Sequence, residues 1–496
     1  MSLVRDVVTG VKWSAVGRSG EHLVGFITTA VLVHLLSPQA FGVVAIAALV
    51  TGFLVVIADL GTATALIQRP DVSDTLESTV FWASLVIGLV LTGLAWALAP
   101  AVGLFFHDPA VVPVVRALSL TVTFGAVGAV PTALLTRRLS FDSIARVQLA
   151  ASGLGGAAGV ALAFSGAGAW SLVGQVLTRT ALEAAGMLAF SKFRPWAGFR
   201  RKDLVSVASF GVNLSGFHVT NFVTRNIDNL LIGRFLGATM LGYYDVAWRL
   251  IEYPKAALAG IVGRVTVPAY ARMQADDERF GRAYLRVVAA IALVTVPAMI
   301  GLMVVAWPFV RVVFGNAWLS TALLVTVLAP VGLAQSMGST TGGVYIAKDR
   351  TGWLFAWSVL ASGCTAAAVA VGLRWGVVGV AAGRLLAAGV LFPLNLAISL
   401  GFVGLGLRHL GRTVGPVLAA GLVMAVGVML LRLAMLAVGV VSPLATLLTA
   451  IPAGAIIYGI ALWRLRPPIL VEILSTLVTA DVAWARPLLA RAERAW

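Results

Sequence analysis

Four polar side chains recur at helical spacing within an otherwise apolar stretch, FHVTNFVTRNIDNLLIGR at 217–234. They are separated by three, four and three residues, which places them on one face of a helix: His218, Asn221, Arg225 and Asp228. This face suits the wall of a polar cavity in which Arg225 binds an anionic group. The alternative is an ion pair between Arg225 and Asp228 that neutralises both charges and ties the helix to a neighbour.

Three further groups of charged or polar side chains share this helical spacing. They are Arg18, Glu21 and His22; Gln175, Arg179 and Glu183; and Asp245, Arg249 and Glu252. The first and third groups suit either a cavity wall or ion pairs, whereas the second is expected to pack against neighbouring helices. A buried carboxyl group can bind a proton near neutral pH, and histidine titrates there. Four ionisable residues could bind a coupling ion or could simply form ion pairs, and the sequence favours neither role: Glu21, His22, Asp59 and Glu252.

The composition indicates a membrane protein with many spans. The chain has 496 residues, of which 60% are hydrophobic and 11% are charged, whereas an ordinary soluble domain is about 25% charged. Apolar runs of about twenty residues fit transmembrane helices, and they lack the alternation of barrel strands. An Arg or Asp at a helix centre costs about 2.5 to 3.5 kcal/mol on insertion scales, so such charges normally face a partner or a wet cavity.

The charge pattern and the motifs exclude several classes of function. The net charge of +16 is scattered through short loops, so we expect no nucleic-acid partner. Cys364 is the only cysteine, which excludes an internal disulfide and a multi-cysteine metal site. The sequence has no P-loop, no HExxH metal motif and no GxSxG nucleophile motif. We therefore expect no catalytic residues, no metal, no cofactor and no enzymatic activity.

Hydropathy windows of about nineteen residues predict about fourteen transmembrane helices. Their approximate extents are 14–36, 41–67, 78–106, 111–135, 143–165, 168–190, 204–236, 241–270, 284–314, 319–346, 353–373 and 376–400, with two more within 413–463 that divide near Arg432. Alternate loops carry Lys and Arg, so the positive-inside rule places both termini in the cytoplasm, as in a multi-pass protein of the bacterial inner membrane. The tail at 464–496 is predicted to be an amphipathic helix on the inner surface.

A weak internal repeat predicts two lobes. LLSPQAFGVVAIAALV at 35–50 aligns with FLGATMLGYYDVAWRL at 235–250, so that Gly42 and Gly242 coincide at an offset of 200 residues. We therefore expect six-helix lobes at 1–190 and 204–400, joined by a basic linker at 191–203 and followed by two helices at 401–463. Parallel halves around a central site are a common plan of transporters.

Three segments carry a resemblance to a known family: GTATALIQRPDVSDTLESTVFW at 61–82, RNIDNLLIGRFLGATMLGYYDVAWRL at 225–250 and FGNAW at 314–318. They resemble the polysaccharide transporter family of the multidrug/oligosaccharidyl-lipid/polysaccharide exporter superfamily, and the likeness covers about residues 1–410. The nearest likeness is to Wzx-type flippases and to colanic-acid and succinoglycan exporters. The resemblance implies an all-α, MATE-like fold of two six-helix bundles around a cavity. It also implies that cations bind a diphosphate, a role that we assign to Arg18, Arg225 and Arg249.

The resemblance implies a flippase that moves undecaprenyl-diphosphate-linked oligosaccharide repeat units from the inner to the outer leaflet by alternating access. The product would be an exopolysaccharide, a capsule or a lipopolysaccharide. Candidate partners are membrane lipids, a polysaccharide polymerase and export machinery. A multidrug exporter of the same architecture is the first alternative. A membrane-bound glycan polymerase or ligase is the second, and the absence of a large external loop argues against it.

Overall fold

Helices make up the structure throughout the residues that the computed structural model describes, which are 2–58, 66–67, 69, 72–196, 198–272 and 276–470. Side chains are described in these ranges except at 2–12, 14–16, 201, 203–218 and 256–272. The described residues contain no strand. Contacts divide the chain into two compact units, Met1–Val246 with Leu373–Val377, and Ala247–Gly372 with Val378–Trp496. The predicted lobe boundary at 191–203 stays a prediction.

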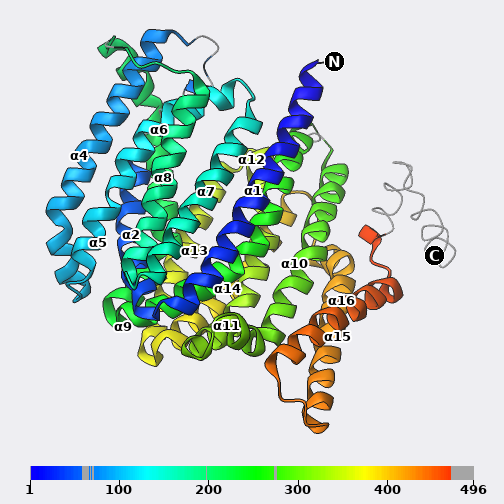
Figure 1. Cartoon of the computed structure of the whole chain (residues 1–496). Helices are drawn as coiled ribbons and strands as arrows, with labels where there is room; N and C mark the ends of the chain where they lie inside the picture. Colours follow the sequence, from blue (N-terminus) through cyan, green and yellow to red (C-terminus); the bar gives the residue numbers. More distant parts are fainter. Residues whose placement is uncertain are drawn as a thin grey trace. The chain divides into compact units, whose positions relative to one another are not determined.

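The helices of the first unit pack both against their neighbours in sequence and against helices more distant along the chain. In chain order they are α1 (Ser2–Leu35), α2 (Pro38–Ala58), α4 (Asp74–Phe106), α5 (Val111–Leu118), α6 (Leu120–Arg137), α7 (Phe141–Phe164) and α8 (Ala169–Ser191). Within this unit α7 packs between α1 and α8, while α6 packs against α4 and α8 (Figure 1). Small residues permit the close approach, since a Cβ on Gly17 of α1 would lie 2.6 Å from the Cβ of Ala145 on α7.

The long segment α9 (Arg201–Arg272) is two helices separated by a break at Gly237. Gly237 has φ 84° and ψ 173°, a conformation that glycine adopts without the steric cost of a side chain. The break falls between the predicted helices at 204–236 and 241–270, so this turn is confirmed.

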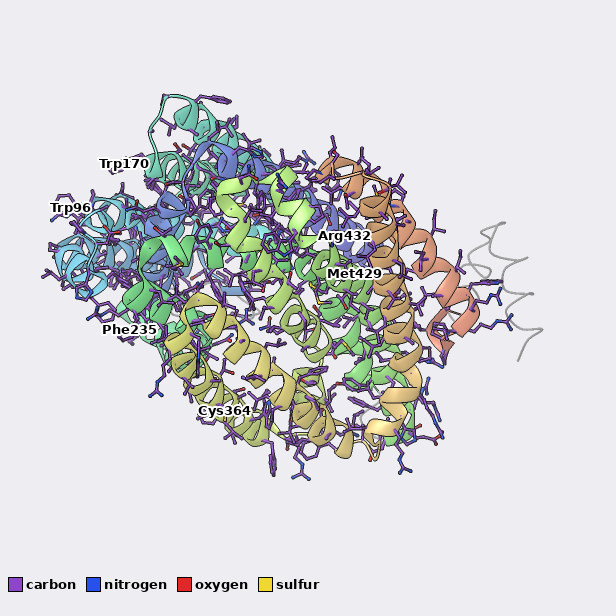
Figure 2. The ribbon with its side chains drawn as sticks, turned by 90° about the horizontal axis from the view of Figure 1, so that it is seen from below. Trp96, Trp170, Phe235, Cys364, Met429 and Arg432 are labelled. Atoms are coloured by element: carbon purple, nitrogen blue, oxygen red, sulfur yellow. The ribbon has the colours of Figure 1, made fainter. Side chains whose placement is uncertain are left out.

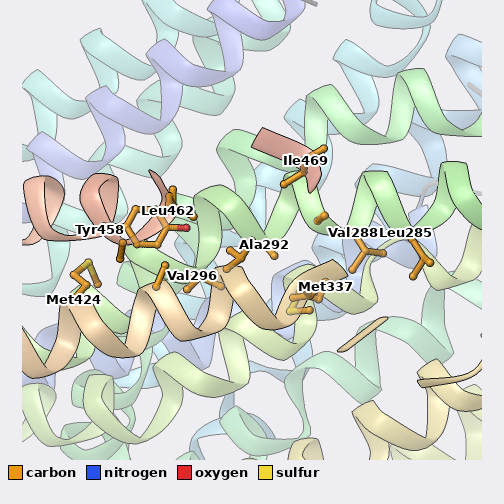
Figure 3. Packing of buried hydrophobic residues seen from close by; sticks show 14 of the residues in the cluster. Leu285, Val288, Ala292, Val296, Met337, Met424, Tyr458, Leu462 and Ile469 are labelled. Atoms are coloured by element: carbon orange, nitrogen blue, oxygen red, sulfur yellow. The ribbon is translucent and has the colours of Figure 1, made fainter. Parts of the chain in front are cut away.

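The helices that follow α9 lie in the second unit, apart from Leu373–Val377, and several of them share one core. They are α10 (Asp277–Val313), η1 (Asn316–Trp318), α11 (Leu319–Gly338), α12 (Thr341–Ala347), α13 (Thr351–Gly372), α14 (Gly376–Gly401), α15 (Leu407–Ala437) and α16 (Pro443–Leu465), with the short η2 (Leu373–Trp375) ahead of α14. Packing of α10 against α11, α15 and α16 buries Ala292, Val296, Met337, Met424 and Tyr458 in one cluster (Figure 3).

Side chains cap the N-termini of α4 and α10. Ser73 Oγ accepts from the backbone N–H of Leu76 at 3.3 Å, and Asp276 Oδ1 accepts from that of Arg279 at 2.9 Å. Each cap binds one of the backbone donors that a helix start leaves without a partner in the helix. Acidic residues follow both caps in the first turn, where they complement the helix dipole.

The expected all-α membrane fold is confirmed. Among the described residues, nine helical segments are long and apolar enough to cross a membrane, and one of them, Thr351–Gly401, contains both α13 and α14. The helix surfaces carry large exposed apolar side chains, including Trp96, Trp170, Phe235 and Met429 (Figure 2). A lipid environment accounts for their exposure, since soluble proteins rarely expose large apolar patches.

The predicted turn at Arg432 is wrong. Arg432 lies inside α15, and the chain turns at 438–442, where Gly439 has φ 84°. The guanidinium Nη1 of Arg432 donates to the backbone oxygen of Val304 at 2.7 Å, so a neighbouring helix supplies the acceptor for this charge. A cation in an apolar run therefore marked a helix contact rather than a loop. The predicted amphipathic tail lies outside the described residues from 471 onward.

Candidate functional site

Asp228 is a buried carboxylate whose hydrogen-bond donor lies across the Gly237 break. Only 2% of Asp228 is exposed, and Tyr244 is fully buried. The phenol of Tyr244 donates to Asp228 Oδ2 at 2.5 Å. A hydrogen bond to a charged group contributes about 1.5–3 kcal/mol. The bond therefore stabilises the bend by joining the two parts of α9 within the first unit.

Arg225, one turn before Asp228, has a different partner. Its Nε donates to Asn221 Oδ1 at 3.1 Å, and the side chain is exposed. Among the described residues no ion pair joins Arg225 to Asp228, so this structure gives no support to a self-neutralising pair. The cavity wall stays a prediction. The Nη atoms of Arg225 bond to no described residue, which leaves them able to bind an anion. His218 lies in α9, but its side chain falls outside the described residues.

Glu21 on α1 forms an ion pair with Arg179 on α8. Arg179 Nε also donates to Glu183 Oε1 at 3.0 Å, so one guanidinium binds two carboxylates. This contact matches the expectation that the polar face of α8 packs against neighbouring helices. Glu21 therefore has an ordinary ion-pair partner, which was the alternative to a role in binding a coupling ion.

The remaining predicted residues of the first unit have less defined surroundings. Arg18 is exposed on α1, and His22 is half-buried there. Asp59 lies outside the described residues. Their roles in substrate binding or ion coupling stay predictions.

A second polar group, the Trp248 cluster, lies in the second unit and comprises Trp248, Glu252, Lys255, Gln335 and Arg384. The guanidinium carbon of Arg384 is 4.5 Å from the centre of the Trp248 ring, and Lys255 Nζ is 5.6 Å from the ring centre. Lys255 also donates to Glu252 Oε1 at 2.5 Å and to Gln335 Oε1 at 2.7 Å. Side chains from α9, α11 and α14 therefore meet at one point.

The Trp248 cluster carries more positive than negative charge, with two cations and one carboxylate. Arg384 is only 7% exposed, and an aromatic face stabilises a desolvated cation by about 2 kcal/mol. A guanidinium held against a ring in this way keeps its planar N–H fork directed, and this fork matches carboxylate and phosphate oxygens. The chemistry that suits the cluster is anion binding. Arg249, one turn from Glu252, is half-buried, and its predicted role in binding stays a prediction.

Sequence reasoning found Glu252 but missed Trp248, Gln335 and Arg384. Arg384 interrupts the apolar run GVAAGRLLAAGV, which is the same signal of an intramembrane cation that drew attention to Arg225. Trp248 and Gln335 carry no such signal, because neither side chain is charged and only their tertiary neighbours show their role. Within the described residues, no group of three or more His, Cys, Asp and Glu is placed to hold a metal ion.

A protein-family model described as "Polysaccharide biosynthesis protein" matches residues 31–323, which is more than half of the chain. The chain belongs to this family. The match includes the first unit from the end of α1 onward, the whole of α9 and most of the residues that precede α12.

Curated relatives of the family cover about three quarters of the chain. The lipopolysaccharide biosynthesis protein WzxC of Escherichia coli (strain K12) is 28% identical over 78% of this chain and 79% of its own length. The succinoglycan biosynthesis transport protein ExoT of Rhizobium meliloti (strain 1021) is 29% identical over 74% of each chain. The teichuronic acid biosynthesis protein TuaB of Bacillus subtilis (strain 168) is 27% identical over 72% of this chain and 74% of its own.

Solved structures share the fold at low sequence identity. The lipid II flippase MurJ in an inward closed conformation is 15% identical, with a TM-score of 0.73 over 90% of this chain and 97% of that chain. A multidrug resistance MATE transporter in an inward-facing conformation is 16% identical, with a TM-score of 0.61 over 80% of this chain and 99% of that one. These likenesses confirm the MATE-like fold class expected from the sequence.

Proposed function

We propose that this polysaccharide biosynthesis family member is a flippase for undecaprenyl-diphosphate-linked oligosaccharide repeat units. It moves them across the inner membrane by alternating access, for exopolysaccharide, capsule or lipopolysaccharide biosynthesis. Both termini lie in the cytoplasm, and the linker at 191–203 joins lobes at 1–190 and 204–400. A polysaccharide polymerase and export machinery act on the flipped units, and the protein itself is not an enzyme.

The observation that carries this proposal is the family match over residues 31–323. Three relatives bear names that refer to lipopolysaccharide, teichuronic acid and succinoglycan, which are all polymers of the cell surface. The shared task of such relatives is the supply of sugar polymers to the outside of the cell. A transporter fold without a large external loop suits movement of a precursor better than its polymerisation.

The cations on the helices give the proposal its chemistry. A charged diphosphate group can cross the apolar part of a membrane only where polar groups of the protein take the place of its hydration water. Arg225 in the first unit and the Trp248 cluster in the second unit offer guanidinium and ammonium donors for this purpose. Arg18 and Arg249 remain further candidates. For coupling ions the candidates remain Glu21, His22, Asp59 and Glu252.

A multidrug exporter is the second candidate function, since a MATE transporter shares the fold with a TM-score of 0.61. The excess of cations over acids in the Trp248 cluster argues against it, because Lys255 and Arg384 would repel a cationic drug there. An anionic ligand fits the cluster better.

The test is deletion of the gene, followed by separate assays of surface polymer, lipid-linked repeat units and dye efflux. We expect loss of surface polymer and accumulation of lipid-linked repeat units that are protected from periodate added outside spheroplasts. Accumulated units that periodate reaches would instead indicate a polymerase. Normal surface polymer with altered dye efflux would favour the multidrug exporter. Normal surface polymer without accumulated lipid-linked repeat units would contradict the flippase proposal.

A further inference from the structure

The basic linker after α8 is held in place as a strap over the ends of other helices. Phe193 is buried in the core formed by the start of α4 and the end of α6. Trp82 Nε1 donates to the backbone oxygen of Trp196 at 2.9 Å, and the backbone N–H of Arg200 donates to Thr79 Oγ1 at 3.0 Å. We refer to residues 192–196 and 198–200 as the strap. Its backbone is thus fixed to the first unit at three separate points.

The side chains that the strap does not use for this attachment are largely exposed. Trp196 and Phe199 are each 54% exposed. Lys192, Arg194 and Arg200 are exposed as well, and their side chains form no hydrogen bond or ion pair with any described residue. Two aromatic rings and three cations are therefore exposed on the surface of the strap.

This surface lies where membrane spans end. The strap contacts α4 in its first two turns, and the segment Asp74–Phe106 is long and apolar enough to cross a membrane. At the other side, Arg138 Nη1 donates to the backbone oxygen of Ser191 at 2.8 Å, just beyond the crossing segment Val111–Arg137. The ends of spans meet the lipid headgroups, so the strap lies at headgroup level.

From this geometry we propose that the strap binds the headgroups of anionic phospholipids. Among the described side chains, the cations around it outnumber the acids: Arg137, Arg138, Lys192, Arg194 and Arg200 lie there against Asp74 and Glu77 in the first turn of α4. Basic residues beside a membrane attract anionic lipids, and aromatic rings insert at the headgroup boundary. Cations together with exposed aromatic rings at headgroup level favour a lipid surface as the partner. An acidic soluble protein would be bound by the cations alone, without aromatic rings at this depth. This site is separate from the proposed transport function.

The test is lipid binding to the purified full-length protein by native mass spectrometry after delipidation. Phosphatidylglycerol and phosphatidylethanolamine of the same acyl chains are the two probes. The wild type is expected to prefer phosphatidylglycerol, and the double variant Arg194→Gln/Arg200→Gln is expected to bind it roughly fivefold or more weakly. A second variant, Trp196→Ala/Phe199→Ala, keeps the charge and is expected to weaken binding as well.

The matched control is Arg408→Gln/Arg412→Gln, which removes two exposed cations from α15. It should change phosphatidylglycerol binding by less than about twofold, and all variants should unfold at the wild-type temperature because the altered strap cations have no described partners. Equal weakening by the control and the strap variants would overturn the proposal. So would equal affinity for the two lipids, or strap-dependent binding of polyglutamate together with unchanged lipid binding.

Discussion

Gly42 and Gly242 each lie against the backbone of the other's helix, where the start of α2 crosses the second part of α9. A Cβ on Gly42 would stand 1.7 Å from the backbone oxygen of Ala238, and a Cβ on Gly242 would stand 1.9 Å from that of Pro38. The contact is reciprocal, because each glycine faces the residue four positions before the other. The same offset of 200 residues relates both pairs, so the repeat seen in the sequence corresponds to a symmetric crossing of two helices.

Gly42→Ala and Gly242→Ala should each destabilise this crossing. A methyl group at either site meets backbone atoms that cannot rotate away, so the helices must separate, at a cost of about 1–3 kcal/mol. Thermal unfolding of the purified protein measures the loss. The matched controls are Gly93→Ala and Gly125→Ala, because nothing lies within 4 Å of a Cβ there. Equal unfolding temperatures for all four variants would show that the two helices are not in close contact at this crossing.

Asp228 and Tyr244 should behave as a coupled pair. Tyr244→Phe removes the phenol that donates to Asp228, and Asp228→Ala removes the acceptor. In a double-mutant cycle of unfolding free energies, the coupling should reach about 1–3 kcal/mol. The cycle of Asp228→Ala with Arg225→Ala should be additive within about 0.5 kcal/mol, since no described contact joins them. Strong coupling in this second cycle would restore the ion-pair interpretation.

Arg225→Ala should impair flipping and leave membrane abundance unchanged. Its exposed guanidinium is bound by Asn221 alone among the described residues, so its loss removes ligand contacts rather than packing. Arg225→Lys should restore only part of the activity, because an ammonium cannot form the two-pronged contact to phosphate. Surface polymer in a complemented deletion strain reports the activity. Arg311→Ala, which removes another exposed cation, should have no effect; a similar loss there would point to net charge instead.

Arg384→Lys should weaken the Trp248 cluster despite keeping the charge. The planar guanidinium of Arg384 stacks on Trp248 in a buried setting, and the expected loss of stability is about 2 kcal/mol. Arg116→Lys is the control, since Arg116 lies 4.7 Å from the centre of the exposed Trp96 ring. The loss there should be about 0.5–1 kcal/mol. Thermal unfolding compares the two, and equal losses would argue against a special role of burial.

Glu21 and Arg179 should contribute a modest coupling energy between α1 and α8. Arg179 keeps 38% of its side chain exposed, so water screens the pair and the expected coupling is about 1 kcal/mol. A cycle of Glu21→Ala and Arg179→Ala measures it by unfolding. The exposed pair of Glu278 and Arg282 serves as the control and should give about 0.5 kcal/mol or less. A transport defect in Glu21→Gln at unchanged stability would instead support ion coupling.

Local properties of the chain were readable from the sequence. Apolar runs set where helices form, because each run must satisfy its backbone hydrogen bonds within lipid. The gap between the helices predicted at 204–236 and 241–270 contains Gly237, where α9 breaks. The stripe of Asn221, Arg225 and Asp228 was visible as well, since helical spacing alone puts residues on one face. The error at Arg432 arose because a cation in an apolar run has two solutions, a loop or a contact with another helix, and α10 supplies the contact.

Tertiary structure alone decided which partner each polar group has. Asp228 binds Tyr244 rather than Arg225, and Arg384 stacks on Trp248 from a helix more than a hundred residues away in sequence. The spacing of residues along one helix determines the direction of a side chain, but it contains no information about what stands opposite. That neighbour depends on how helices cross, and the crossing is set by the packing of many small contacts such as Gly42 against Ala238.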